Sequence, residues 1–376
     1  MQKISRRNFL AASAGAALGL AGMRAAIAAA PKPSNDFDFV LLGDLHYDKL
    51  AHHDMEWLAR EHPGDVHQVQ NYSQITRDIV PGLFQEVKDV VTSSKVPMPF
   101  VAHIGDLVEG LCGTPELAQM QCREALALVN DAKFGIPFQM ITGNHDITGP
   151  GAADAYDSIL CPSLTGKVSD PKSASYFTEH HGMQFLYFDA FRPSSLDWTE
   201  KTLAGRTDKP LIFLIHMPVV PYNARANWIA FSHANEADKR KRLLNLLGRH
   251  KAVVLTGHLH KYSTVVRQTD SGPFVQLAIC SVIPSASVQP KGVLTGIDQY
   301  TADLVNLEPK FSDKTLDERR ALLESEKPFI RHFDYADATG YSVVSVRDGN
   351  VSVSLYNGLG RRLWKTVDLT GLLSAA

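Results

Sequence analysis

Histidine, aspartate and asparagine side chains follow short apolar runs at five places in this sequence. The runs end in the segments "GDLH", "GDLVEG", "GNHD", "LIHMP" and "GHLH". The side chains of interest are Asp44, His46, Asp106, Asn144, His145, Asp146, His216, His258 and His260. They offer nitrogen and oxygen donors and no thiolate, a set that suits Zn²⁺, Mn²⁺ or iron. The five segments therefore predict a metal site.

Two bound ions would account for this set of donors better than one. The donors outnumber the ligands of a single tetrahedral ion, whereas two ions about 3.5–4 Å apart, bridged by a carboxylate, would use them all. Such a pair generates hydroxide at neutral pH and holds a phosphoryl group for in-line attack. Each motif alone is more often structural, because Asn and Asp also suit tight turns. Five in this order favour chemistry.

The apolar runs that precede the motifs are predicted to be strands. They span residues 37–46, 99–110, 137–146, 209–218 and 252–260. Continuous apolar and β-branched runs are typical of strands buried on both faces. Ligands of open α/β sheets bind beyond the carboxyl ends of the strands, where these donors lie. On extended chain, alternation would place Asp44 with His46, and His258 with His260, on one face. The preceding glycines permit sharp turns and close backbone approach.

Helices and hairpins are predicted between and after these strands. The helix candidates are residues 73–94, a helix capped by Thr114, residues 195–205 and residues 235–248. The hairpins are predicted to turn at His181-Gly182, within the segment "TDSG" at residues 269–272, and at Asp348-Gly349. Strands that alternate with helices favour an α/β or layered αββα architecture. Residues 47–72 and 284–335 are expected to be long loop insertions of the kind that often form lids.

The first thirty residues have the layout of an export signal. Lys3, Arg6 and Arg7 precede small and apolar residues that end in an Ala-x-Ala site at residues 26–28. The segment "SRRNFL" resembles the twin-arginine signal. We therefore expect residues 1–30 to be a cleaved signal peptide, although an uncleaved anchoring helix is the alternative. The twin-arginine translocation machinery would then be a partner, and the protein would be periplasmic or secreted.

Composition narrows the class of protein further. The chain has 376 residues, of which 44% are hydrophobic and 21% charged, values typical of a soluble globular protein. Beyond the first thirty residues we expect no stable membrane insertion, and residues 31–376 are expected to form one domain. A formal net charge of −2 and the lack of a basic run argue against a nucleic-acid partner. Cys112 and Cys122 could pair in an oxidising compartment, with four free thiols as the alternative.

The order of the five motifs resembles that of the calcineurin-like metallophosphoesterase family, over residues 37–260. The resemblance implies a four-layer αββα sandwich with mixed sheets and a binuclear metal centre. It implies that Asp44, His46 and His260 bind the first metal and that Asn144, His216 and His258 bind the second. Asp106 would bridge the two ions, beside a bridging hydroxide that acts as the nucleophile. His145 would assist the leaving group, and Asp146 would orient His145.

The function that the resemblance implies is that of an exported phosphoesterase. Two divalent or trivalent transition-metal ions, of Mn, Fe or Zn, would serve hydrolysis of a small phosphate ester. A phosphodiesterase or nucleotide pyrophosphatase with the same metal core is an alternative. A non-catalytic interaction module is another, but it would lack some of the ligands, and here none is missing.

Some residues near the motifs depart from the family pattern or have no role in it. Glu109 stands three residues after Asp106, where the related purple acid phosphatases carry a metal-binding tyrosine. We expect it to cap a turn, with assistance to the site as the alternative. Tyr47 and Asp48 directly follow the first ligand pair and are expected to form the pocket wall. The insertion histidines His52, His53, His62 and His67 are each expected to be solvated loop residues, with a place in the pocket as the alternative. His103, inside a predicted strand, is expected to pack in the core.

Overall fold

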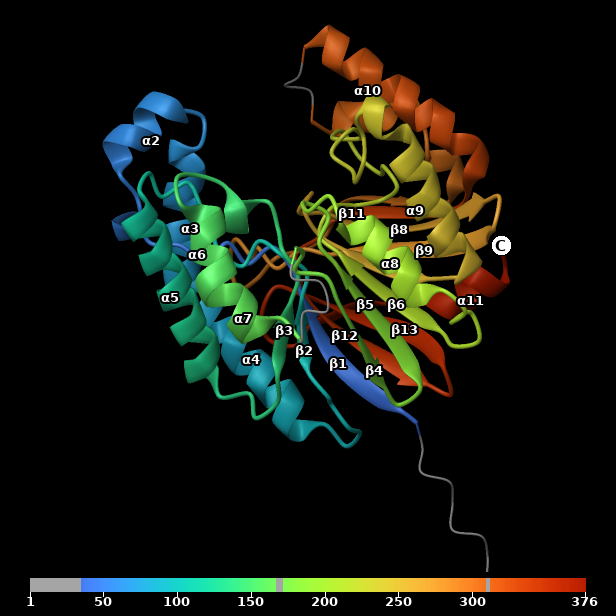
Figure 1. Ribbon diagram of the computed structural model, residues 1–376, viewed down its shortest axis with the longest axis horizontal. Coiled ribbons are helices and arrows are strands. Elements are labelled where there is room, and N and C mark those ends of the chain that lie inside the picture. The colour runs from blue at the N-terminus through green and yellow to red at the C-terminus, as the bar shows by residue number, and fades with distance from the viewer. Residues whose placement is uncertain (1–34, 167–171, 309–311) are drawn as a thin grey trace, which may run out of the picture. The chain divides into compact units, whose positions relative to one another are not determined.

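Two β-sheets lie at the centre of this protein, and helices cover the outer face of each (Figure 1). The structure is a computed structural model that describes residues 35–166, 172–308 and 312–376. The predicted signal peptide, residues 1–30, lies outside the described residues. Within the described residues, all five of the predicted strands are present, three of them in one sheet and two in the other.

The first sheet has six strands among the described residues, in the order β14-β13-β12-β1-β2-β3. Their bounds are β1 (Phe37–Leu42), β2 (Val101–His103), β3 (Phe138–Met140), β12 (Gly340–Arg347), β13 (Asn350–Asn357) and β14 (Leu363–Asp368). β1, β2 and β3 run parallel, with Leu42 opposite His103 and His103 opposite Met140, whereas β12 pairs antiparallel with β1. The carboxyl ends of the three parallel strands therefore meet at one edge.

The second sheet has eight strands among the described residues, in the order β10-β11-β8-β9-β7-β6-β5-β4. Their bounds are β4 (Tyr176–His180), β5 (Met183–Phe188), β6 (Leu211–Ile215), β7 (Val253–Thr256), β8 (Tyr262–Thr269), β9 (Gly272–Ala278), β10 (Lys291–Thr295) and β11 (Ile330–Asp337). β5, β6, β7 and β9 are parallel, and the other pairings are antiparallel. The three predicted hairpins, β4–β5, β8–β9 and β12–β13, are all confirmed.

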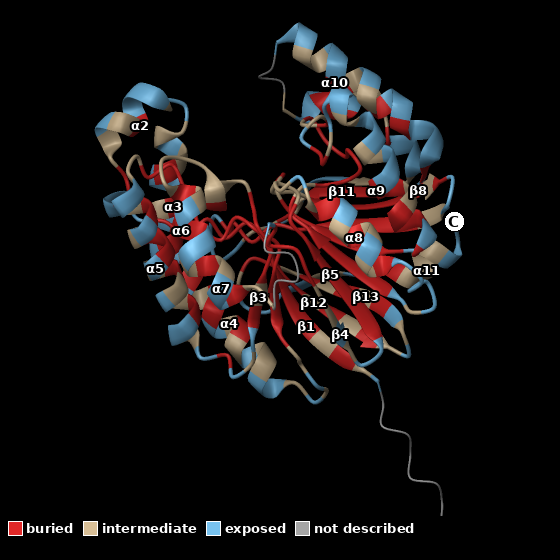
Figure 2. Ribbon diagram, in the orientation of Figure 1, coloured by how far each residue is buried: buried red, intermediate tan, exposed pale blue. Residues whose placement is uncertain are grey.

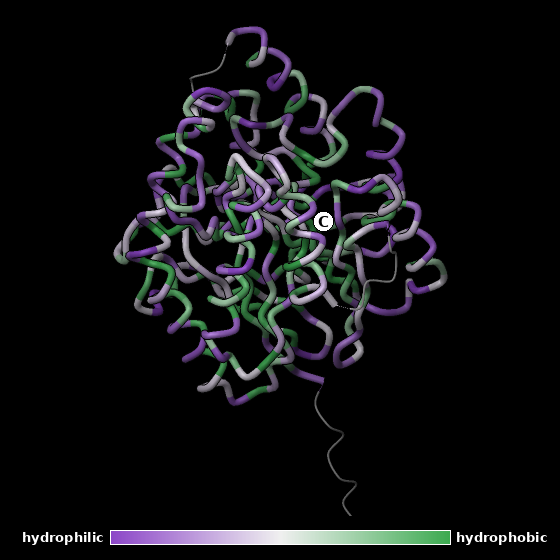
Figure 3. The backbone as a smooth tube through the Cα atoms, turned by 60° about the vertical axis from the view of Figure 1, so that its left-hand side comes forward, coloured by the Kyte–Doolittle hydropathy of each residue, from purple (hydrophilic) through white to green (hydrophobic). Residues whose placement is uncertain are grey.

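Three apolar clusters hold the layers together. One packs β1–β3 against the helices on the left of Figure 1, and it includes Val40, Val101 and Met140. Another fills the space between the sheets, with Phe39 and Leu255 among its members. The third packs the second sheet against its own helices. Figure 2 shows the strands as mostly buried, and Figure 3 shows the hydrophobic segments gathered inside. The predicted four-layer αββα arrangement with mixed sheets is confirmed.

The helices of the described residues follow the strands in the predicted alternation. Their bounds are α2 (Met55–Glu61), α3 (Val66–Asp78), α4 (Val80–Ser93), α5 (Pro115–Ala132), α6 (Ala152–Ala155), α7 (Cys161–Leu164), α8 (Ser195–Leu203), α9 (Ala237–Arg249), α10 (Asp313–Glu326) and α11 (Leu369–Ser374). Shorter 3-10 or π turns span Leu50–His52, His145–Ile147, Tyr156–Leu160, Ala234–Glu236, Ile297–Gln299, Ala302–Leu307 and Lys327–Phe329. Among the described residues, none of these helices combines the length and the apolar character needed to cross a membrane.

Two features predicted from the sequence are wrong. The helix predicted at 73–94 is two helices, α3 and α4, because Pro81 stands in the first turn of α4 and the chain bends at Ile79. The insertions at 47–72 and 284–335 are not loops. The first folds into α2 and the start of α3, and the second contains α10 and strands of the second sheet. Both insertions therefore supply ordered structure around the strand ends.

Candidate metal centre

The predicted ligands converge where the carboxyl ends of parallel strands from the two sheets meet. Asp44 and His46 follow β1, Asp106 follows β2, and Asn144 follows β3. His216 follows β6 of the second sheet, and His258 and His260 follow β7. Within the described part of the chain there are three groups of donor atoms whose members all lie within 4.8 Å of one another, and two of these groups consist of predicted ligands only. They are Asp44–His46–Asp106–His260 and Asp106–His216–His258, so Asp106 belongs to both.

The backbone at these positions differs from the extended chain that alternation assumed. Asp44, His46, Asp106, His258 and His260 all have positive φ, between 47° and 72°. Non-glycine residues rarely adopt this left-handed region, and such positions cluster at functional sites. The strands end before the ligands, since β1 ends at Leu42 and β7 ends at Thr256. The donors therefore converge because the chain turns at each ligand, which sequence periodicity does not reveal.

Two glycines allow the loops to approach the ligands closely. A Cβ on Gly257 would lie 2.4 Å from Oδ2 of Asp44, and a Cβ on Gly143 would lie 2.2 Å from Oδ1 of Asp106. Neither contact is sterically tolerable. The backbone N–H of His258 donates to Oδ1 of Asp44 over 2.7 Å, and that of His145 donates to Oδ1 of Asp106 over 2.8 Å. The predicted close approach at these glycines is therefore present, and it orients both carboxylates.

The ring nitrogens of the histidines face one another and face oxygen donors. Nε2 of His46 lies 2.9 Å from Nε2 of His260, and Nε2 of His216 lies 3.2 Å from Nδ1 of His258. Nε2 of His216 also lies 3.1 Å from Oδ2 of Asp106 and 3.1 Å from Oδ1 of Asn144. Lone pairs that converge in this way match the donor set of a nitrogen- and oxygen-ligated transition metal.

Outer contacts fix which nitrogen two of the histidines present to the cluster. Nδ1 of His216 donates to the carbonyl oxygen of Ile104 over 2.8 Å, which leaves Nε2 as the ligand atom. Nδ1 of His46 lies 2.6 Å from Oε2 of Glu109, which again leaves Nε2 toward the cluster. Metal-binding histidines commonly use one nitrogen for the ion and the other for a carboxylate or carbonyl group. The geometry is therefore that of preoriented ligands.

The burial of charge in the cluster also fits a bound cation. Burial raises the pKa of Asp44 to about 8. The charge of His216 works against this rise, and the charge of Asp106 adds to it. Within the described residues, Oδ2 of Asp44 is buried and has no hydrogen-bond partner. A divalent cation would offset the cost of burying two carboxylates together and would give this oxygen a partner. The residues present therefore fit a pair of metal ions.

His145 lies beside the cluster and is held by Glu109. Its Nδ1 donates to the carbonyl oxygen of Glu109 over 2.8 Å and lies 3.3 Å from Oε2 of the same residue. Burial by itself lowers the pKa of His145, but the charges of Glu109 and Asp106 outweigh it and raise the pKa to about 9. The predicted turn cap at Glu109 is wrong. This carboxylate is fully buried between His46 and His145, and it also accepts from Nε2 of Gln68 over 2.9 Å.

Asp146 does not contact the ring of His145, so its predicted orienting role is wrong. Its carboxylate accepts hydrogen bonds from four backbone N–H groups, those of Asp106, Leu107, Val108 and Gly143. Burial raises the pKa of Asp146 to about 7, and the charge of Asp106 adds to this. Asp146 therefore shapes the loop that carries Asp106, and Glu109 holds His145. The alternative expected for Glu109, a place at the site, therefore fits these contacts, which depend on the tertiary fold.

A cavity of about 370 Å³ opens over the cluster. Its lining residues come from α2, α3 and the loops after β2, β3, β6 and β7: His62, Asp65, Gln68, Tyr72, Leu111, Asn144, His145, Thr148, Arg225, Trp228, His258 and His260. Ligand pockets of about 300–1,000 Å³ accommodate small molecules. The cavity is therefore the candidate substrate site, with the metal cluster at one end.

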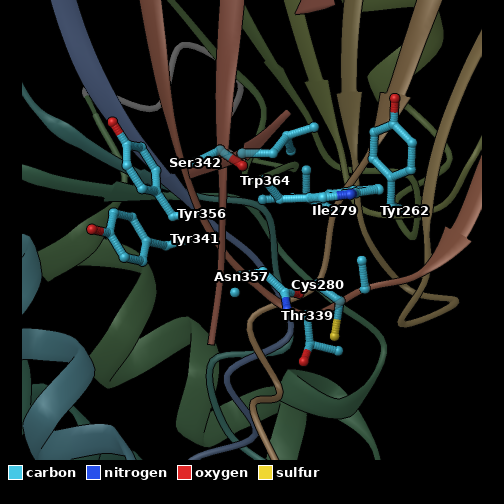
Figure 4. A pocket seen from close by; sticks show the side chains of 12 residues that line it. Tyr262, Ile279, Cys280, Thr339, Tyr341, Ser342, Tyr356, Asn357 and Trp364 are labelled. Atoms are coloured by element: carbon cyan, nitrogen blue, oxygen red, sulfur yellow. The ribbon is translucent and has the colours of Figure 1, made fainter. Parts of the chain in front are cut away.

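Another cavity, which none of the predicted metal ligands lines, is too small for a substrate. It measures about 20 Å³ and is lined by Tyr262, Cys280, Tyr341 and Asn357 among others (Figure 4). The rings of Tyr341 and Tyr356 stack on one side of it, with centroids 5.0 Å apart. A space of this size holds about one water molecule.

The expected pocket wall at Tyr47 and Asp48 is also wrong, because both residues are buried and neither lines the large cavity. Asp48 instead accepts from Oγ of Ser73 over 2.9 Å and lies 2.7 Å from Nε2 of His53. The histidines of the first insertion differ from one another. His52 and His53 are buried, His67 is exposed, and His62 lines the cavity.

The remaining predictions concern core residues and cysteines. His103 is buried in β2 as expected, and burial lowers its pKa to about 3. Cys112, Cys122, Cys161 and Cys280 are all free thiols, so the alternative of unpaired cysteines holds.

Comparison with known proteins places these observations in context. The model of the calcineurin-like phosphoesterase family matches residues 37–262. A probable cyclic nucleotide phosphodiesterase of Psychrobacter arcticus is 28% identical over 140 residues, 35% of this chain and 48% of that protein. The chain therefore matches about half the length of this curated relative.

Two solved structures share the fold. A dimetal phosphatase from Danio rerio has a TM-score of 0.52 at 12% identity, covering 89% of this chain and 99% of that one. A purple acid phosphatase from yellow lupin seeds (Lupinus luteus) has a TM-score of 0.51 at 12% identity, covering 90% of this chain and 55% of that one. At such identities the likeness concerns the fold alone.

Proposed function

Because this chain belongs to the calcineurin-like phosphoesterase family and is a metal-dependent phosphoric ester hydrolase, we propose that two metal ions bind at the strand-end cluster and serve hydrolysis of a small phosphodiester. One observation carries the proposal. Asp106 belongs to both groups of donor atoms, which supports a carboxylate that would be shared by two ions. The ligands would be Asp44, His46, Asp106 and His260 for one ion and Asp106, Asn144, His216 and His258 for the other.

The chemistry of such a pair suits phosphoryl transfer. When bound, two ions of Mn, Fe or Zn lower the pKa of water and neutralise phosphoryl charge. The chain's own contribution is to hold seven donors in place through the turns and backbone hydrogen bonds described above. Because these groups are positioned before the reaction, little reorganisation is needed as charge develops on the phosphoryl oxygens.

His145 is the group that we propose to assist the leaving oxygen. It lines the cavity beside both donor groups, and its Nδ1 is engaged by Glu109. Nε2 is therefore the nitrogen available to a bound ester, at which it can donate a proton or a hydrogen bond. Glu109 also contacts His46, so one carboxylate positions both a metal ligand and the proposed acid.

A diester is the first candidate among substrates, for a reason outside the metal cluster. The curated relative is named a probable cyclic nucleotide phosphodiesterase. That name supports a diester without identifying the substrate of this chain. A nucleotide pyrophosphatase would use the same metal cluster and is the second candidate.

The proposed reaction takes place outside the cytoplasm. The motif "SRRNFL" and the Ala-x-Ala site support export by the twin-arginine machinery, in which case the protein acts in the periplasm or is secreted. Replacing Arg6 and Arg7 together by Lys should retain the protein in the cytoplasmic fraction. Unchanged export of this double variant would contradict the proposal.

A substrate panel tests the proposed reaction. Phosphomonoesters, phosphodiesters and nucleotide pyrophosphates would be assayed with the metal-loaded wild type, His145→Ala and His181→Asn. His181 is the control, because it lies in the β4–β5 turn at the amino end of β5, whereas the cluster lies at carboxyl strand ends. We expect diesters to be cleaved fastest and His145→Ala to lower kcat by about 10²–10⁴-fold. Activity that His145→Ala leaves unchanged would remove His145 from the reaction.

A further inference from the structure

An arginine and a tryptophan form one wall of the large cavity, next to the proposed second metal position. The guanidinium carbon of Arg225 lies over the indole ring of Trp228, 4.5 Å from the ring centroid. The Trp228 ring lies 5.7 Å from the ring of His258. Trp228 is 38% exposed and the Arg225 side chain 33% exposed, although both line the cavity. We call this pair the Arg225–Trp228 shelf.

The shelf is held in place by the second insertion. Arg319 of α10 is buried, and it donates to Oδ1 of Asn227 over 2.7 Å and to the carbonyl oxygen of Ala224 over 2.9 Å. These two contacts hold Ala224 and Asn227, which lie on either side of Arg225 in the chain. Nε of Arg225 donates to Oε2 of Glu308, from the same insertion, over 2.9 Å.

A local turn adds to this support. The backbone N–H of Trp228 donates to the carbonyl oxygen of Arg225 over 2.8 Å, and that of Arg225 donates to Oδ1 of Asn223 over 2.8 Å. Turn and insertion together fix the Arg225–Trp228 shelf before any ligand binds. A preformed wall of this kind can select ligands, because little ordering is needed on binding.

Another part of the cavity wall is polar. His62 and Asp65 line it from the connection between α2 and α3, and Gln68 lines it from the start of α3. They offer carboxylate, imidazole and amide groups, which form hydrogen bonds with the edge of a ligand. One wall therefore offers a planar aromatic and cationic surface, and other lining groups offer hydrogen bonds. A heteroaromatic base, with its π face and polar edge, matches both.

We propose that the Arg225–Trp228 shelf binds the nucleobase of a nucleotide substrate and thereby sets the specificity of the enzyme. The inference rests on the proposed function, because it requires the phosphoryl group to lie at the strand-end cluster. The 5.7 Å between the rings of Trp228 and His258 puts the shelf close to that cluster. A base joined to the phosphoryl group through one sugar can therefore lie at the shelf.

Equilibrium binding tests the inference without relying on turnover. The probes are adenosine 5′-monophosphate and ribose 5-phosphate, which share the sugar phosphate and differ in the base. Their Kd values would be measured by calorimetry on the metal-loaded full chain. Because stacking of one base on an aromatic side chain contributes about 1–3 kcal/mol, adenosine 5′-monophosphate should bind roughly 5- to 150-fold more tightly.

Variants assign that difference to the shelf. Trp228→Ala should bring the two Kd values together by weakening only the binding of adenosine 5′-monophosphate, and Trp228→Phe should retain most of the preference. Trp198→Phe is the matched control, because Trp198 lies on α8 and packs in the third apolar cluster. Equal Kd values in the wild type, or a preference that Trp228→Ala leaves unchanged, would overturn the inference. Failure of both probes to bind would instead contradict the proposed function.

Arg319 is a positioning residue in this account, and it has a separate test. Arg319→Met should reduce the preference for adenosine 5′-monophosphate while leaving the Kd of ribose 5-phosphate unchanged. Arg319→Lys should restore part of the preference, since it keeps one donor. An unchanged Kd of ribose 5-phosphate would also show that the Arg319→Met variant is folded. If Arg319→Met keeps the full preference, the second insertion does not position the shelf.

Discussion

The strand-end cluster and the walls of the cavity above it are built in different ways. Each donor of the cluster lies within a few residues of a strand, and short motifs carry it. Walls of this cavity come from the first insertion and from the loop after β6, and the second insertion supports that loop. Their contacts join distant parts of the chain: Arg225 and Glu308 are 83 residues apart, and Arg319 and Asn227 are 92 apart.

This difference separates two properties of the enzyme. In the proposed function, the cluster determines which bond can be cleaved, because it places the donors. The walls would determine which ester fits, because they place the groups around it. Changes in the cluster should therefore abolish the reaction, whereas changes in the supports of the walls should alter stability or specificity. The five predictions below test this separation, from the largest expected effect to the smallest.

Loss of the bridging carboxylate should have the largest effect. Asp106→Asn removes the charge shared by both donor groups, so activity should fall by about 10³-fold or more, the upper range for one preorganised group. Steady-state kinetics with saturating metal would measure the loss. Asp270→Asn, at an exposed position in the β8–β9 turn, is the control. Activity within about tenfold of the wild type would show that Asp106 does not hold the metals.

Breaking the ion cluster that anchors the second insertion should lower stability. Glu326 is buried and accepts from Arg240 over 2.7 Å and from Arg267 over 2.6 Å. Because Glu326→Ala leaves two cations unpaired, it should lower the free energy of unfolding by about 3–5 kcal/mol. Glu179 lies between Arg206 and Lys209 at the surface, so Glu179→Ala should cost less than about 1 kcal/mol. Equal losses in urea unfolding would contradict this ranking.

The same cluster gives a pH dependence of stability. Burial alone would raise the pKa of Glu326, but the charges of Arg240 and Arg267 outweigh it and hold the pKa below its usual value. The stabilisation is therefore complete above the pKa of the unfolded chain, about 4.3, and is lost as pH falls through the lower folded-state pKa. The stability difference between wild type and Glu326→Ala should shrink below about pH 4. A constant difference from pH 7 to pH 3 would argue against an ionised Glu326.

Glu109 tests the support of the cluster. Glu109→Gln keeps the shape of the side chain but removes its charge next to His46 and His145. Metal affinity or kcat/KM should fall by about 10–100-fold, as is usual when the partner of a metal-binding histidine is changed. Chelator competition would measure the metal affinity, and steady-state kinetics would measure kcat/KM. The control is Glu124→Gln, because Glu124 is a partly exposed carboxylate of α5 that pairs with Lys49. If neither quantity changes, the contacts of Glu109 serve packing alone.

The smallest effect is expected at a helix cap. Oγ1 of Thr114 accepts from the backbone N–H of Leu117 at the start of α5, the cap predicted from the sequence. Thr114→Ala should lower the free energy of unfolding by about 1 kcal/mol, and Thr114→Ser should restore it. Kinetic constants should not change. If Thr114→Ala loses activity under conditions in which the variant is fully folded, α5 is coupled to the site.

The comparison also explains which features the sequence alone could predict. Strands and hairpins were predicted because apolar runs and turn residues such as Asp348-Gly349 act locally. The positions of the predicted ligands followed from the same short motifs. Pro81 is a local signal for the break between α3 and α4. The helices of the insertions also have local signals, because Asp54 caps α2 and Ser312 caps α10. Where α10 lies in the fold has no such signal, since contacts with distant residues, such as that of Arg319 with Asn227, fix its position.

The roles of Glu109 and Asp146 show a second reason. Glu109 meets His46 across 63 residues of sequence and His145 across 36, so its role depends on how the loops turn. Asp146 is adjacent to His145 in sequence, but its carboxylate binds backbone N–H groups of the Asp106 loop instead. The positive φ of the ligand residues produces these turns. A sequence pattern of alternating side chains assumes extended backbone and therefore cannot predict them.

The metal content of the purified protein tests the central claim most directly. Mass spectrometry of elements would be applied to the wild type and to Asp106→Asn after exposure to Mn, Fe or Zn and removal of free ions. The account predicts about two transition-metal ions per wild-type chain and a lower content in the variant. Fewer than one bound ion per wild-type chain would contradict a dimetal centre at the strand-end cluster.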